Sequence, residues 1–151
     1  TNIGIDTHSN DYLEILKLAV LLGRTRARML QAAGAKDVKL PTIWSAVEAA
    51  TVKPADGLRR KDLGRITPGA RADLVSVDVS GFLVGVGAKP AEPLNNLLYA
   101  NGTAVRDVLV EGAFKVADGA LVADNAAEVS RKGAAVVTAL WKRLADERWF
   151  T

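Results

Sequence analysis

The fold of this 151-residue chain is decided at residues 1–16, TNIGIDTHSNDYLEIL. The stretch predicts a short buried strand over residues 2–6, a polar turn and the start of a helix. The strand ends in a carboxylate, Asp6, and barrel enzymes carry their catalytic groups at this end of their strands. A single strand cannot form a sheet, and no methionine precedes Thr1. We therefore expect the chain to be the C-terminal part of a larger protein.

Composition excludes several classes of protein. A hydrophobic content of 49% with 25% charged residues is typical of a folded globular protein. No apolar run approaches the roughly 20 residues that span a bilayer, and no signal peptide is visible, so we expect no membrane association. The absence of cysteine fits a cytoplasmic location. The net charge is +3, but the basic clusters at residues 24–28 and 58–61 contain no aromatic residues, so we predict no nucleic-acid partner.

Helical spacing of apolar residues follows the turn and continues to about Ala33. Asn10 or Asp11 offers a side-chain acceptor for the start of this helix, and Gly34 marks its end. Gly23 interrupts the pattern, so one helix and two helices joined by a bend are both possible.

A second helix is predicted with Pro41 in its first turn. One face would carry four apolar residues, Ile43, Trp44, Val47 and Ala50. A third, short helix is predicted at residues 54–58.

The second half of the chain carries turn and strand signals. Pro68-Gly69 predicts a type II turn with Gly69 at positive φ, followed by a strand at residues 74–77. A strand or short helix is possible at residues 94–100. Further along, the pattern predicts a hairpin of residues 105–110 and 113–116, a turn at 118–119, and a helix from an Asn125 cap to about Trp149.

Two polar residues in the first turn are candidates for chemistry. Asp6 can bind a metal or transfer a proton at the mouth of a barrel, and it can equally cap the turn through its side chain. His8 is the only histidine. One histidine cannot form a standard zinc site, so we predict that it contacts substrate or hydrogen-bonds within the loop. Gly85-Val86-Gly87 lacks a strand-to-helix context, so no organic cofactor is predicted there.

Four segments together resemble the amidohydrolase superfamily, in particular its deaminase and chlorohydrolase branch. The first is the last-strand signature, with Asp6 after Gly4 and Ser9-Asn10 downstream. The others are a helix with Ala49-Ala50-Thr51, a segment similar to "G-x-I-x-P-G-x-x-A-D-L-V" at residues 64–75, and a terminal hairpin at residues 105–119.

The resemblance implies an α/β fold: the last βα unit of a (β/α)8 TIM barrel, part of a small composite β-sandwich and a C-terminal helix. The corresponding domains are residues 1–60, 61–124 and 125–151. Asp6 would be the catalytic aspartate of the eighth barrel strand and would also contact the metal, a divalent ion that is zinc or, alternatively, iron. Residues missing from this chain would provide the other ligands, since the family's H-x-H motif is absent.

The intact protein would then be a hydrolase of non-peptide carbon–nitrogen bonds in a small nitrogen heterocycle, and this chain alone would be inactive. Its partners would be the N-terminal remainder of the same enzyme, a small-molecule substrate and further copies in a homo-oligomer. The alternative is a non-catalytic interaction module that retains part of the fold. An H-x-H motif in an upstream sequence would favour the enzyme, and a start codon just before Thr1 would favour the module.

Overall fold

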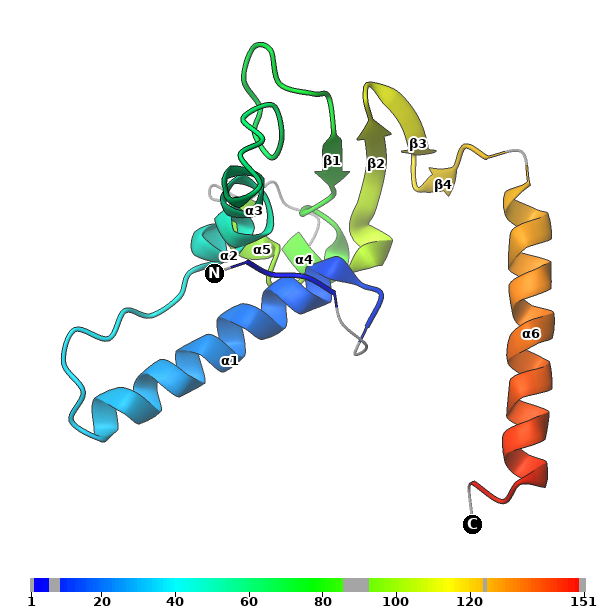
Figure 1. The fold of residues 1–151 in the computed structure, drawn as a ribbon, viewed down its shortest axis with the longest axis horizontal. Coiled ribbons are helices and arrows are strands. Elements are labelled where there is room, and N and C mark those ends of the chain that lie inside the picture. The colour runs from blue at the N-terminus through cyan, green and yellow to red at the C-terminus, as the bar shows by residue number, and fades with distance from the viewer. Residues whose placement is uncertain (1, 6–8, 86–92, 124, 150–151) are drawn as a thin grey trace.

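The computed structural model describes residues 2–5, 9–85, 93–123 and 125–149. Three helices are followed by a small antiparallel sheet, and a long helix stands apart at the C-terminal end (Figure 1). The elements are α1 (Tyr12–Ala32), α2 (Ile43–Ala50), α3 (Val52–Gly57), β1 (Leu74–Val77), α4 (Phe82–Gly85), α5 (Pro93–Asn96), the 3-10 turn η1 (Gly102–Ala104), β2 (Val105–Val110), β3 (Ala113–Ala117), β4 (Ala120–Leu121) and α6 (Ala126–Asp146).

Helix α1 is continuous and begins at the predicted cap. Asp11 is the N-cap, and its side chain accepts hydrogen bonds from the backbone N–H groups of Leu13 and Glu14. Gly23 does not bend the helix. A Cβ at Gly23 would lie 2.8 Å from Cγ of Pro41, so the missing side chain lets the segment before α2 pack closely against α1. The predicted end of the helix at Gly34 is confirmed, because α1 ends at Ala32 and Gly34 has φ of +88°.

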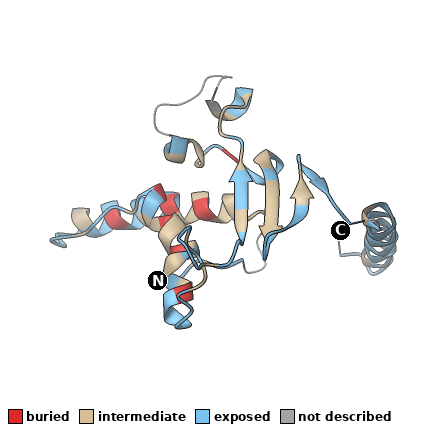
Figure 2. Cartoon of the chain, turned by 90° about the horizontal axis from the view of Figure 1, so that it is seen from above, coloured by how far each residue is buried: buried red, intermediate tan, exposed pale blue. Residues whose placement is uncertain are grey.

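Helix α2 packs across α1 and forms the hydrophobic core with it. The core consists of Leu16 and Val20 from α1 and Ile43 and Ala46 from α2, and Val20 is completely buried. Figure 2 shows that the buried residues lie mainly on these helices.

Two details of the prediction for α2 are wrong. Pro41 precedes the helix, because Thr42 is the N-cap and forms a reciprocal capping box with Ser45. Trp44 is 59% exposed, since the buried face is formed by the small side chains of Ala46 and Ala49 together with Ile43. A bulky indole on that face would hold α1 and α2 further apart than alanine does.

The predicted strand at residues 2–6 is not formed in the described residues 2–5. A strand needs a neighbouring strand to accept and donate its ladder hydrogen bonds, and the described sheet lies elsewhere in the fold. Ile3 instead donates its backbone N–H to the carbonyl of Ala49 in α2, over 3.0 Å. This bond fixes the N-terminal segment to the second helix.

The sheet is an antiparallel meander with the order β1-β2-β3-β4. Both predicted turns are confirmed: Glu111 and Gly112 have φ of 51° and 80°, and Asp118 and Gly119 have φ of 50° and 79°. Two consecutive residues with positive φ match the twist of the flanking strands. For residues 94–100 the sequence allowed a strand or a short helix, and the structure has the short helix α5 at Pro93–Asn96.

Helix α6 covers no other element. None of its described residues is buried, and Figure 1 shows it projecting away from the sheet. Asn125 lies at the predicted N-cap, but its side chain makes no capping hydrogen bond. The apolar side of α6 is therefore exposed, with Val136 and Trp141 at 68% and 55%. No helix among the described residues is long and apolar enough to cross a bilayer.

The loop from α3 to β1 is held by two glycine turns and a set of ion pairs. Gly69 has φ of +84°, as predicted, and a side chain there would meet open space. Gly64 has φ of +69°, and a Cβ would lie 2.7 Å from the carbonyl carbon of Thr51. The loop therefore packs directly against the backbone between α2 and α3 at Gly64.

Charged residues connect this loop to α3 and join two parts of the loop to each other. Asp56 of α3 pairs with Lys61 at 2.8 Å and Arg65 at 2.5 Å, and these hydrogen bonds lower the pKa of its carboxyl. Asp62 pairs with Arg60 at 2.7 Å and Arg71 at 3.2 Å. The Arg60 guanidinium holds the pKa of Asp62 well below its usual range, with a smaller contribution from Arg71.

A comparison of Gly64→Ala and Gly69→Ala tests the close contact of the loop. Both substitutions put a side chain at positive φ, which costs about 1 kcal/mol. Gly64→Ala should cost clearly more, because its methyl group also overlaps the Thr51 carbonyl. Thermal unfolding of both variants measures the difference. Equal losses would show that the loop can move away from Thr51.

The ion pairs predict a pH dependence of stability. A carboxyl whose pKa is lower in the folded state stabilises the fold above its unfolded pKa of about 3.9. That contribution disappears as the pH falls through the lower folded value. Asp62→Asn should therefore reduce the melting temperature at pH 6, and the difference from wild type should shrink below about pH 3. High salt should also shrink it, because the pairs are exposed. A difference that is constant with pH would contradict this role.

Candidate functional site

Both sequence-predicted site residues, Asp6 and His8, lie outside the described residues, as do Val86 and Gly87. The structure does describe the chain on either side of Asp6 and His8. Ile3 precedes them, and Ser9, Asn10 and Asp11 follow them. These flanking residues and the contacts that hold them are the part of the candidate site that the structure describes.

Asp11 connects the segment after His8 to two parts of the fold. Its Oδ1 accepts from Leu13 N at 3.0 Å and from Glu14 N at 3.2 Å, which caps α1. Its Oδ2 accepts from the backbone N–H of Gly102 in η1 at 2.7 Å. The cap could be predicted from the sequence. The contact with Gly102 could not, because 91 positions separate the two residues and no local signal marks the pair.

Tyr12 connects the segment after His8 to the segment before Asp6. Its hydroxyl donates to the Ile3 carbonyl at 2.8 Å. Burial raises the pKa of this phenol above its usual value, so the hydroxyl keeps its proton and remains a donor. Ser9 adds a local bond, since its Oγ accepts from the Asp11 N–H at 3.0 Å. Ser9 thus holds the N-cap residue Asp11 rather than capping the helix itself.

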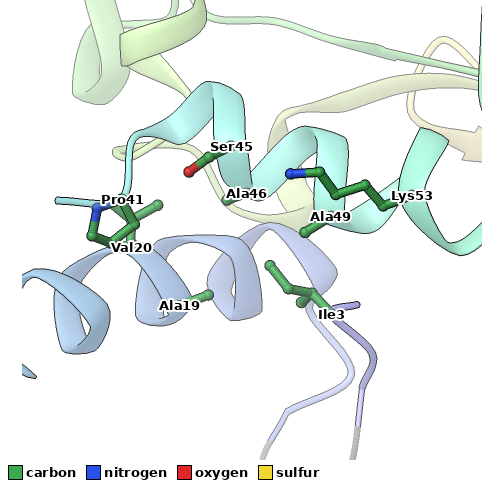
Figure 3. Close-up of a pocket in the computed structure, with 8 residues that line it drawn as sticks. All are labelled: Ile3, Ala19, Val20, Pro41, Ser45, Ala46, Ala49 and Lys53. Atoms are coloured by element: carbon green, nitrogen blue, oxygen red, sulfur yellow. The ribbon is translucent and has the colours of Figure 1, made fainter. Parts of the chain in front are cut away.

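A groove of about 300 Å³ runs between α1 and α2 (Figure 3). Its lining is mainly apolar, with Ile3, Val20 and Ala49 among the residues that form it. Ser45 and Lys53 are the polar residues of the lining. Among the described residues that line it there is no carboxylate or imidazole, so we interpret the groove as a packing surface rather than a catalytic site.

A larger cavity, about 520 Å³, separates the start of α1 from the sheet. Valines of β1 and β2 line one side, and Leu13, Leu16 and Val47 line the other. Asn10 and Asp11 lie at its edge. The lining is mainly apolar, and the carboxylate of Asp11 is already bound to the backbone N–H groups of Leu13, Glu14 and Gly102. We therefore interpret this cavity too as a packing surface that the described residues leave uncovered.

A metal site cannot be built from the described residues. Among them, no group of three histidine, cysteine, aspartate or glutamate side chains lies close enough to hold an ion. Asp6 and His8 would add at most two ligands, whereas zinc sites in proteins use three or four. The described residues by themselves therefore hold no such site.

Comparison with known proteins identifies the family. The model of the amidohydrolase family matches residues 2–116, which is more than half of the chain. The chain belongs to the amidohydrolase family, and the membership predicted from its sequence motifs is confirmed.

Two curated relatives share part of the sequence. An imidazolonepropionase of Streptomyces griseus is 46% identical over 63 residues, which cover 42% of this chain and 15% of the relative. An imidazolonepropionase of Salinispora arenicola is 46% identical over 57 residues, which cover 38% of this chain and 14% of the relative. The chain thus matches only a small part of these proteins.

Solved structures resemble a larger part of the chain. A triazine hydrolase variant superposes with a TM-score of 0.63 and 26% identity, covering 81% of this chain and 25% of that one. An adenosine deaminase from Xanthomonas campestris with bound zinc gives a TM-score of 0.52 and 32% identity, covering 72% of this chain and 25% of that one. Together with the family match, these neighbours indicate an α/β fold related to the TIM barrel.

Proposed function

We propose that the protein to which this chain belongs is a metal-dependent hydrolase of non-peptide carbon–nitrogen bonds in a small nitrogen heterocycle. The family match over residues 2–116 carries the proposal. The names of the similar proteins refer to imidazolone, triazine and adenosine, each of which contains a ring with nitrogen atoms. The zinc in the adenosine deaminase supports a divalent metal, with zinc as the first candidate and iron as the second.

Asp6 is the proposed catalytic residue of this chain. Its carboxylate would accept the proton of the attacking water and deliver it to the leaving group, which is general acid–base catalysis. A carboxylate oxygen is also a suitable ligand for the metal, and most of the other ligands would come from the remainder of the protein. His8 is the proposed substrate contact, because an imidazole can donate or accept a hydrogen bond.

The proposed division of the chain follows from the same resemblance. Residues 1–60 would end the barrel, residues 61–124 would form part of a composite β-sandwich, and residues 125–151 would form a separate C-terminal helix. The single sheet β1–β4 has uncovered apolar residues that a second layer would bury. The N-terminal remainder of the enzyme is the proposed source of that layer. We further propose that the enzyme is cytoplasmic and forms a homo-oligomer.

Asp6→Asn in the intact protein tests the catalytic assignment. The amide keeps the shape of the side chain but is not a proton acceptor, so turnover should fall by about 10²–10⁴-fold. The measurement is turnover on a panel of heterocycles, together with the metal content of the purified variant. Asp146→Asn, at the exposed end of α6, is the matched control and should keep wild-type turnover. Near-normal turnover of Asp6→Asn with metal bound would assign Asp6 to turn capping.

A second experiment tests the dependence on the rest of the protein. Residues 1–151 expressed alone should aggregate, or bind the complementary fragment, because the cavity beside the sheet and the apolar side of α6 are open to water. Size-exclusion chromatography with light scattering and a thermal melt would report this. A monodisperse monomer that melts cooperatively would contradict the proposal and favour an independent, non-catalytic module.

A further inference from the structure

Helix α6 carries an apolar stripe along most of its length. With 3.6 residues per turn, six positions fall on one side of the helix, within about 100° of its circumference. The charged residues Arg131 and Lys142 lie on the opposite side. None of the six is buried, although five have large aliphatic side chains. The stripe consists of Val129, Gly133, Val136, Val137, Leu140 and Leu144.

The described part of this chain does not cover the stripe. Figures 1 and 2 show α6 standing apart from the sheet and from the other helices. The match to the family model ends at residue 116, and α6 begins at Ala126, so the helix lies outside the region that the family model describes. A continuous apolar stripe of this length marks a contact with another molecule or domain.

The spacing of the stripe is the same when it is read from either end. From Val129 to Leu144 the successive intervals are four, three, one, three and four residues, and the midpoint lies between Val136 and Val137. A second α6 that lies antiparallel, midpoint on midpoint, therefore places stripe residues against stripe residues throughout. Val129 faces Leu144 of the second copy, and Leu144 faces its Val129. A two-fold contact between identical surfaces requires this kind of self-complementarity.

The sizes of the facing residues also fit the antiparallel arrangement. Gly133 faces Leu140 of the second copy, so a residue without a side chain leaves space for a leucine, as a hole does for a knob. A Cβ at Gly133 would have no described neighbour within 4 Å beyond the adjoining helix backbone, so no described contact requires glycine there. Glycine also weakens a helix interior. A parallel pair would place Gly133 against Gly133 and leave a gap.

We propose that α6 is a dimerisation helix, which binds α6 of a second copy of this protein in antiparallel orientation through the stripe. The inference rests on the homo-oligomer proposed above and assigns its contact surface, and it does not involve the catalytic role of Asp6. With 21 residues, α6 is about 30 Å long and about 10 Å across, which places the contact at the low end of specific interfaces. We therefore expect a monomer–dimer equilibrium that depends on concentration.

Charge variants of the intact protein test the contact. The lysine variant carries Val136→Lys and Val137→Lys, and the glutamate variant carries Val136→Glu and Val137→Glu. Each should raise the dissociation constant of the dimer at least about 100-fold, because four like charges meet at the midpoint. An equimolar mixture of the two variants should associate again. Ala135→Lys, on the polar side of α6, is the matched control and should associate as wild type does.

Analytical ultracentrifugation over a range of concentrations measures these equilibria. An oligomer of unchanged mass in the lysine variant, or a mixture that does not associate, would overturn the inference. A wild-type dimer that survives in both charge variants would overturn the α6 contact and leave the proposed homo-oligomer standing. A wild-type protein that is monomeric at every concentration would overturn both. Turnover of the wild-type protein tests the proposed hydrolase activity separately.

Thermal unfolding distinguishes a second copy from the rest of the same copy as the partner of the stripe. At a dilution where the wild-type protein is monomeric, the lysine variant should melt at the wild-type temperature, because Val136 and Val137 are exposed in the monomer. A lower melting temperature at this dilution, with the oligomer unchanged, would show that the stripe packs within one copy and would overturn the inference.

Disulfide cross-linking tests the orientation, since this chain contains no cysteine. In the antiparallel pair the two copies of residue 129 lie about 22 Å apart along the helix axis, beyond the roughly 7 Å between Cα atoms that a disulfide can join. Val129→Cys alone should therefore not cross-link, whereas its mixture with Leu144→Cys should form a dimer under mild oxidation. Cross-linking of Val129→Cys alone, without cross-linking in the mixture, would indicate a parallel pair and overturn the inference.

Discussion

The contact between α1 and α2 is the interaction on which the described structure depends. Val20 is completely buried there, and the alanines of α2 let the two helices approach closely. The position of α2 in turn sets the position of Ala49, whose carbonyl receives the N–H of Ile3. It also sets Thr51, against which the loop at Gly64 packs. One helix pair thus holds Ile3 at one point and, at another, the loop that leads to the sheet.

The features that the sequence predicted well are those that residues close in the chain determine. Asp11 caps α1 by accepting from two N–H groups of its first turn, and Gly69 takes the positive φ that its turn requires. The two-residue turns Glu111-Gly112 and Asp118-Gly119 place β2, β3 and β4 side by side. In each case one or two residues fix the local backbone, so no knowledge of the remaining fold is needed.

The predictions that failed concern contacts between distant segments. The sequence left open whether the helix bends at Gly23, and only the fold shows that this glycine accommodates Pro41 from another part of the chain. Trp44 fits a helical apolar face by spacing, yet the tight contact with α1 selects the alanines instead. Residues 2–5 have the composition of a strand but have no neighbouring strand among the described residues. For the candidate site, the sequence predicted Asp6 and His8 from their position at the end of this segment and in the turn after it. The hydrogen bonds from Tyr12 to Ile3 and from Gly102 to Asp11 join segments that no local sequence pattern connects, so they could be found only in the folded chain.

The connectivity of the sheet has a consequence for how the chain folds. Strands β2, β3 and β4 are joined by two-residue turns, so their pairing closes only very short loops and can form early. Strand β1 pairs with β2 across the whole of residues 78–104, which makes its addition entropically more costly. Until β1 arrives, the outer edge of β2 is an unpaired strand, open to hydrogen bonding with another chain. Closing the long connection with β1 is therefore the costliest pairing of the sheet, and it is the pairing that covers this edge of β2.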